Sequence, residues 1–367
     1  MSDVVLVSTI GEGERRVGRL TLNTPRILNS LDAEMIEIML AKLLEWAEDD
    51  SIAAVYIDGE GEKAFCAGGD VHELRRSSME NPGGPCTYAE NFFAREYQMN
   101  YALFTYPKPV ICWGHGVVMG GGMGVMAGCS HRVVSERTRI GMPEITIALF
   151  PDVGGSYFLN RTPGMIGRFL SLTSVHINAT DALYANLGDV FLAHEQRHSV
   201  VEALASGPWS SDAAANTAIV DEILGMEATV DQPLGVIEPL MPQINALMAG
   251  DDLNDISDRL LGYEGDNVWL QKARDGFAHG SKLAACWIFR QLNDSANYSL
   301  KEVFDTELRL GANIMRHPEF AEGVRALLVD KDRQPKWQFA TVQDVPMDVL
   351  ESFFSEPSGA PNMHYPW

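Results

Sequence analysis

The sequence predicts an α/β fold for the first part of this chain and a helical region after it. Short apolar strands alternate with loops and amphipathic helices up to about residue 205, a pattern typical of strands joined by crossover connections. Beyond residue 205 the strand patterns fade and helical spacing dominates. We therefore divide the chain into a core over residues 1–205, a helical region over residues 206–354 and an extended tail over residues 355–367 that is rich in proline, glycine and serine.

Local patterns predict the individual elements in order. β-Branched, apolar or alternating residues favour strands, and these lie at residues 4–7, 18–22, 53–57, 110–113, 132–135 and 139–142. Apolar residues at helical spacing favour helices, and these lie at residues 32–48, from about 71, 88–104, from about 121 and 299–310. Asp32 is placed to cap the first helix, and Ser299 with Glu302 forms a capping box at the last one. Glycine-rich loops connect strand to helix at residues 65–70 and 116–122.

Charge and composition exclude several classes of partner. The chain is 46% apolar and carries 50 acidic against 28 basic residues, a net charge of −22. Such a surface repels phosphate backbones and anionic lipid, so we expect neither nucleic-acid nor membrane binding. An anionic small molecule would need local help from backbone N–H groups or a few well-placed cations.

The distribution of cysteine, histidine and glycine argues against several other classes. Five cysteines without a CxxC pair indicate reduced thiols and a cytoplasmic location. The first residues lack a basic stretch followed by an apolar run, so no secretory signal is expected, and the uncharged segment 109–131 is too rich in glycine for a membrane span. The nine histidines show no metal-binding spacing, so we expect no metal.

Two glycine-rich turns, each between a strand and a helix, are candidates for a binding site. The first is Ala67-Gly68-Gly69-Asp70 and the second contains Gly120-Gly121-Gly122. The second lacks both the GxGxxG spacing and the GKS or GKT of nucleotide loops. Each could be a plain structural turn. Together, however, the N–H groups of Gly69 and Gly121 could form a two-donor oxyanion hole, in which one donor contributes about 3–4 kcal/mol to lowering a barrier.

Two carboxylates follow prolines in an apolar stretch. Glu144 comes after Pro143 and Asp152 comes after Pro151. Their spacing of eight does not place them on one helical face, so a bend would have to bring them together. Apolar surroundings raise a carboxyl pKa and suit it to proton transfer. The alternative is that Asp152 caps a turn and Glu144 pairs with a surface base. No GxSxG nucleophile elbow is present, and Cys66 is more typical of a buried filler than of a nucleophile.

These motifs resemble the crotonase superfamily. The segment Ala-Phe-Cys-Ala-Gly-Gly-Asp at residues 64–70 is similar to its AFxAG(G/A)D loop, and Gly120-Gly121-Gly122 is similar to its GGG turn. The resemblance implies a ClpP-like spiral of ββα units followed by helices that commonly make the trimer contacts of a homo-oligomer. The longer helical C-terminus of this chain could instead cover that contact surface and leave a monomer or dimer. It also implies that the peptide N–H groups of Gly69 and Gly121 form the oxyanion hole for a CoA thioester. The implied CoA-binding positions are Arg26, Leu28, Ala67, Gly68, Asp70 and Val71.

Within that superfamily the chain resembles the branch of 3-hydroxyisobutyryl-CoA hydrolases. Hydratases carry a first catalytic glutamate two residues after the GGG turn, where this chain has Gly124. Residues 142–158 instead resemble the MPE…FPDVGGxYF signature of the hydrolase branch, whose acid pair matches Glu144 and Asp152. Residues 322–326 and 330–337 resemble its EGVRA and DKDxxPKW blocks. The similarity extends over nearly the whole chain.

The resemblance implies hydrolysis of a short branched or 3-hydroxy acyl-CoA, with 3-hydroxyisobutyryl-CoA of valine degradation as the expected substrate. Glu144 would act as general base or as nucleophile, and Asp152 would orient the substrate hydroxyl or carry the proton to the leaving thiolate. No metal or redox cofactor is expected, since CoA arrives with the substrate. Two alternatives remain: an enoyl-CoA hydratase or isomerase, and a non-catalytic acyl-CoA-binding protein.

Overall fold

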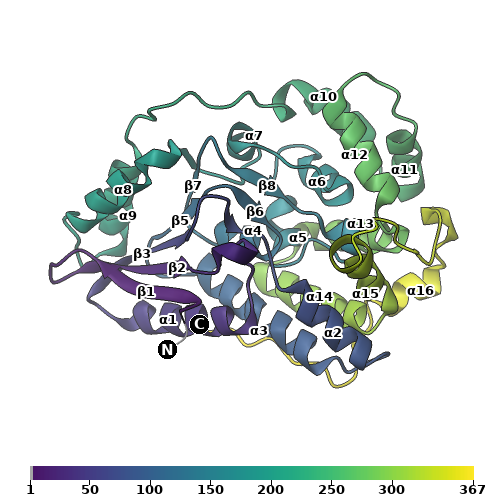
Figure 1. Cartoon of the computed structure of the whole chain (residues 1–367), viewed down its shortest axis with the longest axis horizontal. Coiled ribbons are helices and arrows are strands. Elements are labelled where there is room, and N and C mark those ends of the chain that lie inside the picture. Colours follow the sequence, from purple (N-terminus) through teal and green to yellow (C-terminus); the bar gives the residue numbers. More distant parts are fainter. Residues whose placement is uncertain (1–2) are drawn as a thin grey trace.

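Two β-sheets form the centre of the molecule, and helices surround them (Figure 1). The computed structural model describes residues 3–367. The larger sheet has the strand order β1-β2-β3-β5-β7-β9 and the smaller one β4-β6-β8, and among these pairs β1–β2 alone is antiparallel. The strands are β1 (Val5–Ile10), β2 (Arg16–Leu22), β3 (Ile52–Gly59), β4 (Ala64–Cys66), β5 (Val110–Gly114), β6 (Val117–Met119), β7 (His131–Val134), β8 (Arg139–Gly141) and β9 (Val190–Phe191).

Sixteen α-helices are described within residues 3–367. They are α1 (Ala33–Glu48), α2 (Val71–Glu80), α3 (Thr87–Phe104), α4 (Gly121–Ala127), α5 (Gly155–Leu159), α6 (Ile166–Thr173), α7 (Ala179–Tyr184), α8 (Arg197–Ala205), α9 (Ala213–Leu224), α10 (Ile237–Leu247), α11 (Leu253–Leu261), α12 (Val268–His279), α13 (Lys282–Asp294), α14 (Leu300–Met315), α15 (Pro318–Val324) and α16 (Met347–Ser352). None of them combines the length and hydropathy needed to span a bilayer.

The chain builds both sheets by repeating one unit. In each of the pairs β3–β4, β5–β6 and β7–β8, the first strand joins the larger sheet and the second joins the smaller one. Successive units pair in parallel, for example Val55 with Val110 in the larger sheet and Ala64 with Val117 in the smaller one. This stacking of ββα units confirms the predicted α/β spiral, and the helical C-terminal region follows it.

Most elements with a clear local pattern were predicted correctly. Asp32 caps α1 by accepting a 2.8 Å hydrogen bond from the Met35 N–H, and the capping box of Ser299 and Glu302 opens α14. The prediction was wrong at β4 and β6, which occupy residues expected to be loop. Three-residue strands show no periodicity of their own, and pairing with neighbouring strands stabilises them instead.

The central strands β3 and β5 of the larger sheet are buried on both faces, as expected for parallel strands. Alternate residues of β3 point to opposite sides: Val55 and Ile57 join the main core, while Ala54 and Tyr56 join a smaller cluster. Apolar residues of α8 and α9 complete that smaller cluster, and Figure 1 shows the two helices side by side along the sheet. Helix α9 follows residue 205 in the sequence and still packs on β3. The domain boundary placed at residue 205 stays a prediction.

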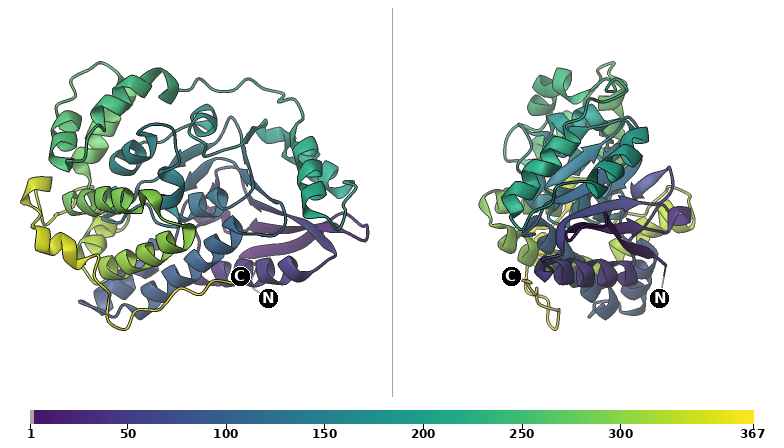
Figure 2. Two further views of the ribbon diagram at one scale, coloured as in Figure 1. Left: turned by 180° about the vertical axis from the view of Figure 1, so that it is seen from behind. Right: turned by 90° about the vertical axis from the view of Figure 1, so that its left-hand side faces the viewer.

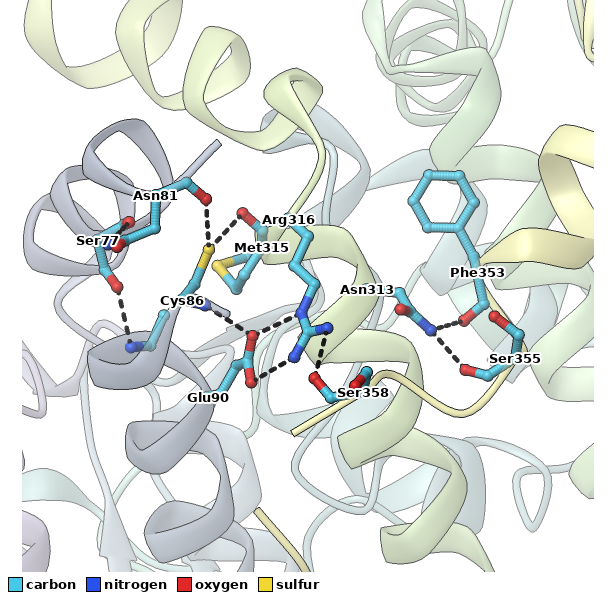
Figure 3. Close-up of polar contacts among 11 residues, drawn as sticks. Ser77, Asn81, Cys86, Glu90, Asn313, Met315, Arg316, Phe353, Ser355 and Ser358 are labelled. Atoms are coloured by element: carbon cyan, nitrogen blue, oxygen red, sulfur yellow. Dashed lines mark hydrogen bonds and ion pairs between the residues drawn. The ribbon is translucent and has the colours of Figure 1, made fainter. Parts of the chain in front are cut away.

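The last residues lie along α3 and α14. After α16 the chain forms neither helix nor strand up to residue 367, and Figure 2 shows this segment passing beneath the helices. Asn313 of α14 donates to the carbonyl oxygens of Phe353 and Ser355, both at 2.8 Å (Figure 3). Farther on, Trp367 donates to the Thr105 hydroxyl at the end of α3. The tail therefore ties the two helices together over the length of α3.

A buried ion pair joins α3 to the end of α14 (Figure 3). The Glu90 side chain is 1% exposed and accepts from Nε and Nη2 of Arg316 at 2.8 and 2.9 Å. It also accepts a 2.8 Å hydrogen bond from the Cys86 N–H, while Arg316 donates to the Ser358 carbonyl of the tail. Helix α14 is thus held in one register against α3, the helix that carries Phe92, Phe93 and Glu96.

We expect Arg316→Met to lower the free energy of unfolding by about 3 kcal/mol, because a buried carboxylate would lose its cation. Urea denaturation followed by circular dichroism measures this loss. The double variant Glu90→Gln/Arg316→Met should recover part of it, since no buried charge then remains unpaired. Wild-type stability of the single variant would contradict this account of the ion pair.

Candidate active site

A cavity of about 80 Å³ lies where the loops after β4 and β6 meet the segment after β8. Three of its lining side chains are carboxylic acids, and the rest are apolar side chains, glycines or proline: Ala67, Gly68, Gly69, Val71, Leu74, Phe92, Phe93, Glu96, Gly120, Gly121, Pro143, Glu144, Ile147, Leu149 and Asp152. No lysine, arginine or histidine is among these residues. The cavity is therefore small, mostly apolar and acidic.

The two glycine turns lie side by side in the cavity wall. Parallel pairing of β4 with β6 brings the carboxyl ends of both strands to the same edge, and α2 and α4 begin directly after the turns. A Cβ on Gly121 would lie 3.4 Å from the Gly69 nitrogen. Gly68 has φ +108°, and a Cβ there would approach the Met119 carbonyl oxygen to 3.3 Å. Glycine is required at Gly68 both by its backbone conformation and by this close approach.

The N–H groups of Gly69 and Gly121 are free to bind a ligand. Within residues 3–367 neither donates a hydrogen bond to another protein group. The bonds around them use other atoms: the Gly68 carbonyl accepts from Leu31, and the Asp70 N–H donates to the Leu31 carbonyl. Two neighbouring peptide donors without partners can stabilise a developing oxyanion.

Glu144 and Asp152 are brought to the same cavity by a bend. Glu144 opens a 3₁₀ turn, η2 (Glu144–Ile147), which ends at Ala148 in the left-handed conformation with φ +51°. The Leu149 N–H then donates to the Glu144 carbonyl at 2.9 Å. The acids are 3% and 4% exposed, and no ion pair involves Glu144 in the described part of the chain. The alternative in which Glu144 pairs with a surface base is therefore wrong.

Sequence reasoning missed a third acid, Glu96 of α3, which is 2% exposed and lines the cavity. The next residue, Tyr97, donates a 2.7 Å hydrogen bond to Oδ2 of Asp152. A signal was available, because Glu96 lies one turn after Phe92 and Phe93 on the apolar face of a predicted helix. An acid on such a face is uncommon unless it is paired or functional.

Burial raises the pKa of all three acids. The pKa of Glu144 lies well above its ordinary value because of desolvation and the nearby Asp152 carboxylate, and the pKa of Glu96 is raised by the same two causes. Desolvation raises the pKa of Asp152 to about 6, although the Tyr97 hydrogen bond opposes the rise. The charge of Asp152 thus links its ionisation to that of Glu96 and of Glu144. Raised pKa values of this kind suit carboxyl groups to proton transfer.

The position that carries the first glutamate in hydratases is closed in this structure. Gly124 of α4 is buried, and a Cβ there would overlap the side chain of Val153 and lie 3.2 Å from Nδ2 of Asn100. A glutamate could not fit without displacing Val153, which is adjacent to Asp152. The acid that accompanies Glu144 in the cavity is therefore either Glu96 of α3 or Asp152.

The residues expected to contact CoA fall into two groups. Arg26 and Leu28 line a surface depression of about 320 Å³ together with Lys63, whereas Ala67, Gly68 and Val71 line the acidic cavity. The groups adjoin, because the Ala67 N–H donates to the Leu28 carbonyl at 3.0 Å. Asp70 lines neither space and caps α2 by accepting from the His72 N–H. The arrangement suits an elongated ligand, and the CoA contacts themselves stay a prediction.

Within residues 3–367 the cysteines form no disulfide, and no cluster of side chains forms a metal site. All five cysteines are unpaired and buried, and burial raises the pKa of Cys66 to about 12, which makes it a poor nucleophile. No group of three histidine, cysteine, aspartate or glutamate side chains in this range could hold a metal ion. That no cofactor is needed stays a prediction.

Comparison with known proteins identifies the family. The sequence model described as enoyl-CoA hydratase/isomerase matches residues 17–354. The chain belongs to the enoyl-CoA hydratase/isomerase family. Two solved members resemble it over almost their whole length: an enoyl-CoA hydratase from Rhodobacter sphaeroides 2.4.1 (31% identity, TM-score 0.85, 99% of this chain and 100% of that one) and a carnitinyl-CoA dehydratase from Mycobacterium thermoresistibile (32%, 0.86, 98% of each). The crotonase fold is thereby confirmed.

Curated relatives from this family carry a hydrolase name. Proteins named 3-hydroxyisobutyryl-CoA hydrolase, mitochondrial, from Gallus gallus, Bos taurus and Homo sapiens are 33%, 35% and 34% identical to this chain. Each alignment covers 92% of this chain and 86% of the relative. The similarity therefore includes the helical region that follows the ββα spiral.

The raised pKa values predict how replacing a cavity acid changes stability with pH. An acid whose pKa is raised by folding contributes stability below its unfolded pKa and loses it as the pH rises through the folded value. Glu144→Gln should therefore melt above wild type by about 2–5 °C at pH 8, and by less at pH 5. Differential scanning fluorimetry measures both. The exposed acid Glu195 offers the control Glu195→Gln, and an equal shift at both pH values would contradict the prediction.

Proposed function

We propose that this protein hydrolyses a short branched or 3-hydroxy acyl-CoA thioester, and that 3-hydroxyisobutyryl-CoA is its substrate. The products would be 3-hydroxyisobutyrate and CoA, a step of valine degradation. The observation that carries the proposal is one cavity in which Glu144 and Asp152 face the glycine turns, while the hydratase position at Gly124 is sterically closed. The names of the curated relatives support the same reaction.

In the proposed reaction the thioester carbonyl oxygen lies between the N–H groups of Gly69 and Gly121. Attack at the carbonyl carbon moves negative charge onto this oxygen, where the two donors stabilise it. The C–S bond then breaks, and the CoA sulfur leaves as a thiolate that takes up a proton. Hydrolysis consumes one water and needs no redox step.

Glu144 has two possible assignments in this scheme. As general base it removes a proton from the attacking water, and as nucleophile it forms an anhydride that water then opens. Asp152 orients the substrate hydroxyl or delivers the proton to sulfur. A single turnover in ¹⁸O-water separates the assignments, since the anhydride route can leave label in the Glu144 carboxyl group whereas the general-base route leaves it in the product alone.

Thiol release tests the proposed activity against the two alternatives. Wild type should release free thiol from 3-hydroxyisobutyryl-CoA, whereas a hydratase would consume the absorbance of an enoyl-CoA without releasing thiol. A non-catalytic binding protein would bind the ester without turnover. Glu144→Gln and Asp152→Asn should each lower kcat by about 100-fold or more, the usual contribution of a proton-transfer group. Near-wild-type kcat in either variant would show that its assigned role is wrong.

The acidic lining predicts which acyl groups are accepted. With three carboxylic acids and no cation among its lining residues, the cavity should accept a neutral hydroxyl group and repel an acyl carboxylate, because close like charges cost several kcal/mol. We expect kcat/KM for methylmalonyl-CoA to be at least about 100-fold below that for 3-hydroxyisobutyryl-CoA. Isobutyryl-CoA serves as an uncharged control without the hydroxyl group. Comparable values for the charged and neutral esters would contradict this prediction.

Location and assembly remain proposals. Unpaired buried cysteines fit a reducing compartment such as the cytoplasm, while the curated relatives are named as mitochondrial proteins. Homo-oligomer formation is proposed from the family resemblance alone, and analytical ultracentrifugation would measure it.

A further inference from the structure

A fourth buried acid lies behind the cavity rather than in its wall. Glu307 is on α14 and is 0% exposed, in the middle of a helix face that is otherwise apolar, with Phe304, Leu308 and Gly311 around it. Within residues 3–367 no lysine, arginine or histidine forms an ion pair with it. A buried carboxylate without a cation destabilises a fold unless other polar groups bind it.

The groups that bind Glu307 are the peptide N–H groups just after Asp152. Its Oε2 accepts from the Gly154 nitrogen at 2.8 Å, and its Oε1 accepts from the Ser156 nitrogen at 2.9 Å. Between them, the Gly155 N–H donates to the carbonyl oxygen of Asp152 at 2.7 Å. Three successive N–H groups are thus bound, two by the Glu307 carboxylate and one by Asp152 itself.

This segment would not hold its shape unaided. Val153 has φ +55° and Gly154 has φ +83°, and a left-handed conformation is unfavourable for a β-branched residue such as valine. The following helix, α5, has no side-chain cap of its own. Glu307 supplies the missing acceptors from a distant part of the chain.

The same helix also supports the Asp152 side chain. Phe304, one turn before Glu307, packs on the Tyr97 ring with centroids 5.9 Å apart, and the Tyr97 hydroxyl donates to Oδ2 of Asp152. Helix α14 therefore acts on Asp152 in two ways. Glu307 binds the backbone that follows Asp152, and Phe304 packs on Tyr97, which donates a hydrogen bond to the Asp152 side chain. We propose that Glu307 is a positioning residue that acts through Asp152, fixing the turn that carries this carboxylate into the cavity.

The arrangement is costly, which argues against a purely structural role. Burial and the nearby charge of Asp152 together raise the pKa of Glu307 to about 8, although the two backbone hydrogen bonds oppose the rise. An apolar side chain of similar volume often stabilises a fold as well as a buried charge does. The presence of a carboxyl group at residue 307 is explained by the conformation that it imposes on the turn after Asp152.

The inference rests on the proposed hydrolase function, and a matched pair of variants tests it. Glu307→Met removes both acceptors while keeping the side-chain volume. The control is Asp181 of α7, another buried acid, whose Oδ1 accepts from the Val236 and Ile237 nitrogens at 2.7 and 2.8 Å and which does not line the cavity. We expect Glu307→Met to lower kcat by about 10–100-fold, since misplacing a catalytic group by 1 Å can cost about 100-fold. Asp181→Leu should leave kcat unchanged.

A double-mutant cycle with Asp152→Asn separates positioning from general destabilisation. If Glu307 acts through Asp152, adding Glu307→Met to Asp152→Asn should lower kcat by less than about 3-fold, because residues that act as a unit are not additive. KM should change by less than about 3-fold throughout, since the lost interaction serves the transition state. Equal effects of Glu307→Met with and without Asp152, or an unchanged kcat, would overturn the proposal.

Two further controls keep the result interpretable. If Glu307→Met does not fold, Glu307→Gln keeps the side-chain shape and one acceptor oxygen, and it should lower kcat by a smaller factor in the same cycle. Failure of the hydrolase proposal is seen separately, since wild type would then release no thiol from any acyl-CoA in the panel. An active wild type combined with an additive cycle rejects the Glu307 inference alone.

Discussion

The close approach of two peptide turns is the constraint on which the rest of this structure depends. Strands β4 and β6 are neighbours in a small parallel sheet, so their carboxyl ends place residues 67–70 and 120–122 against each other. A Cβ on Gly122 would lie 2.7 Å from the Cβ of Cys66, so even alanine would separate the turns. The Gly69 and Gly121 nitrogens can lie close together beside one small cavity only because glycines occupy these positions.

The cavity beside the Gly69 and Gly121 N–H groups is lined by three acids and by no lysine, arginine or histidine. Glu96 comes from α3, while Glu144 and Asp152 come from a single bent segment. Each loses hydration on burial, which raises its pKa, and the charge of Asp152 raises the pKa of Glu96 and Glu144 as well. Such a cluster destabilises the folded protein and suits proton transfer, a trade-off expected of a functional site.

The C-terminal region supports this cluster from behind. Its helix α14 is held against α3 by the Glu90–Arg316 pair and by the final residues of the chain (Figure 3). Through this docking a helix that contributes no side chain to the cavity wall still contacts the turn that bears Asp152. The helical extension after the ββα spiral is in this sense part of the site's framework.

The sequence by itself determined the elements with strong local patterns and both glycine turns, because periodicity, capping and glycine spacing are local properties. The pairing of Glu144 with Asp152 was predicted from the family resemblance, since their spacing alone left it open. Only the tertiary structure decided the rest. Strands β4 and β6 are too short to show a period, and the contact of Glu307 with Gly154 joins residues 153 positions apart. Glu96 appeared in the sequence as one acid on a long helix, and its meaning depended on which face the rest of the fold would bury. Long-range packing sets such contacts, and no short stretch of sequence encodes it.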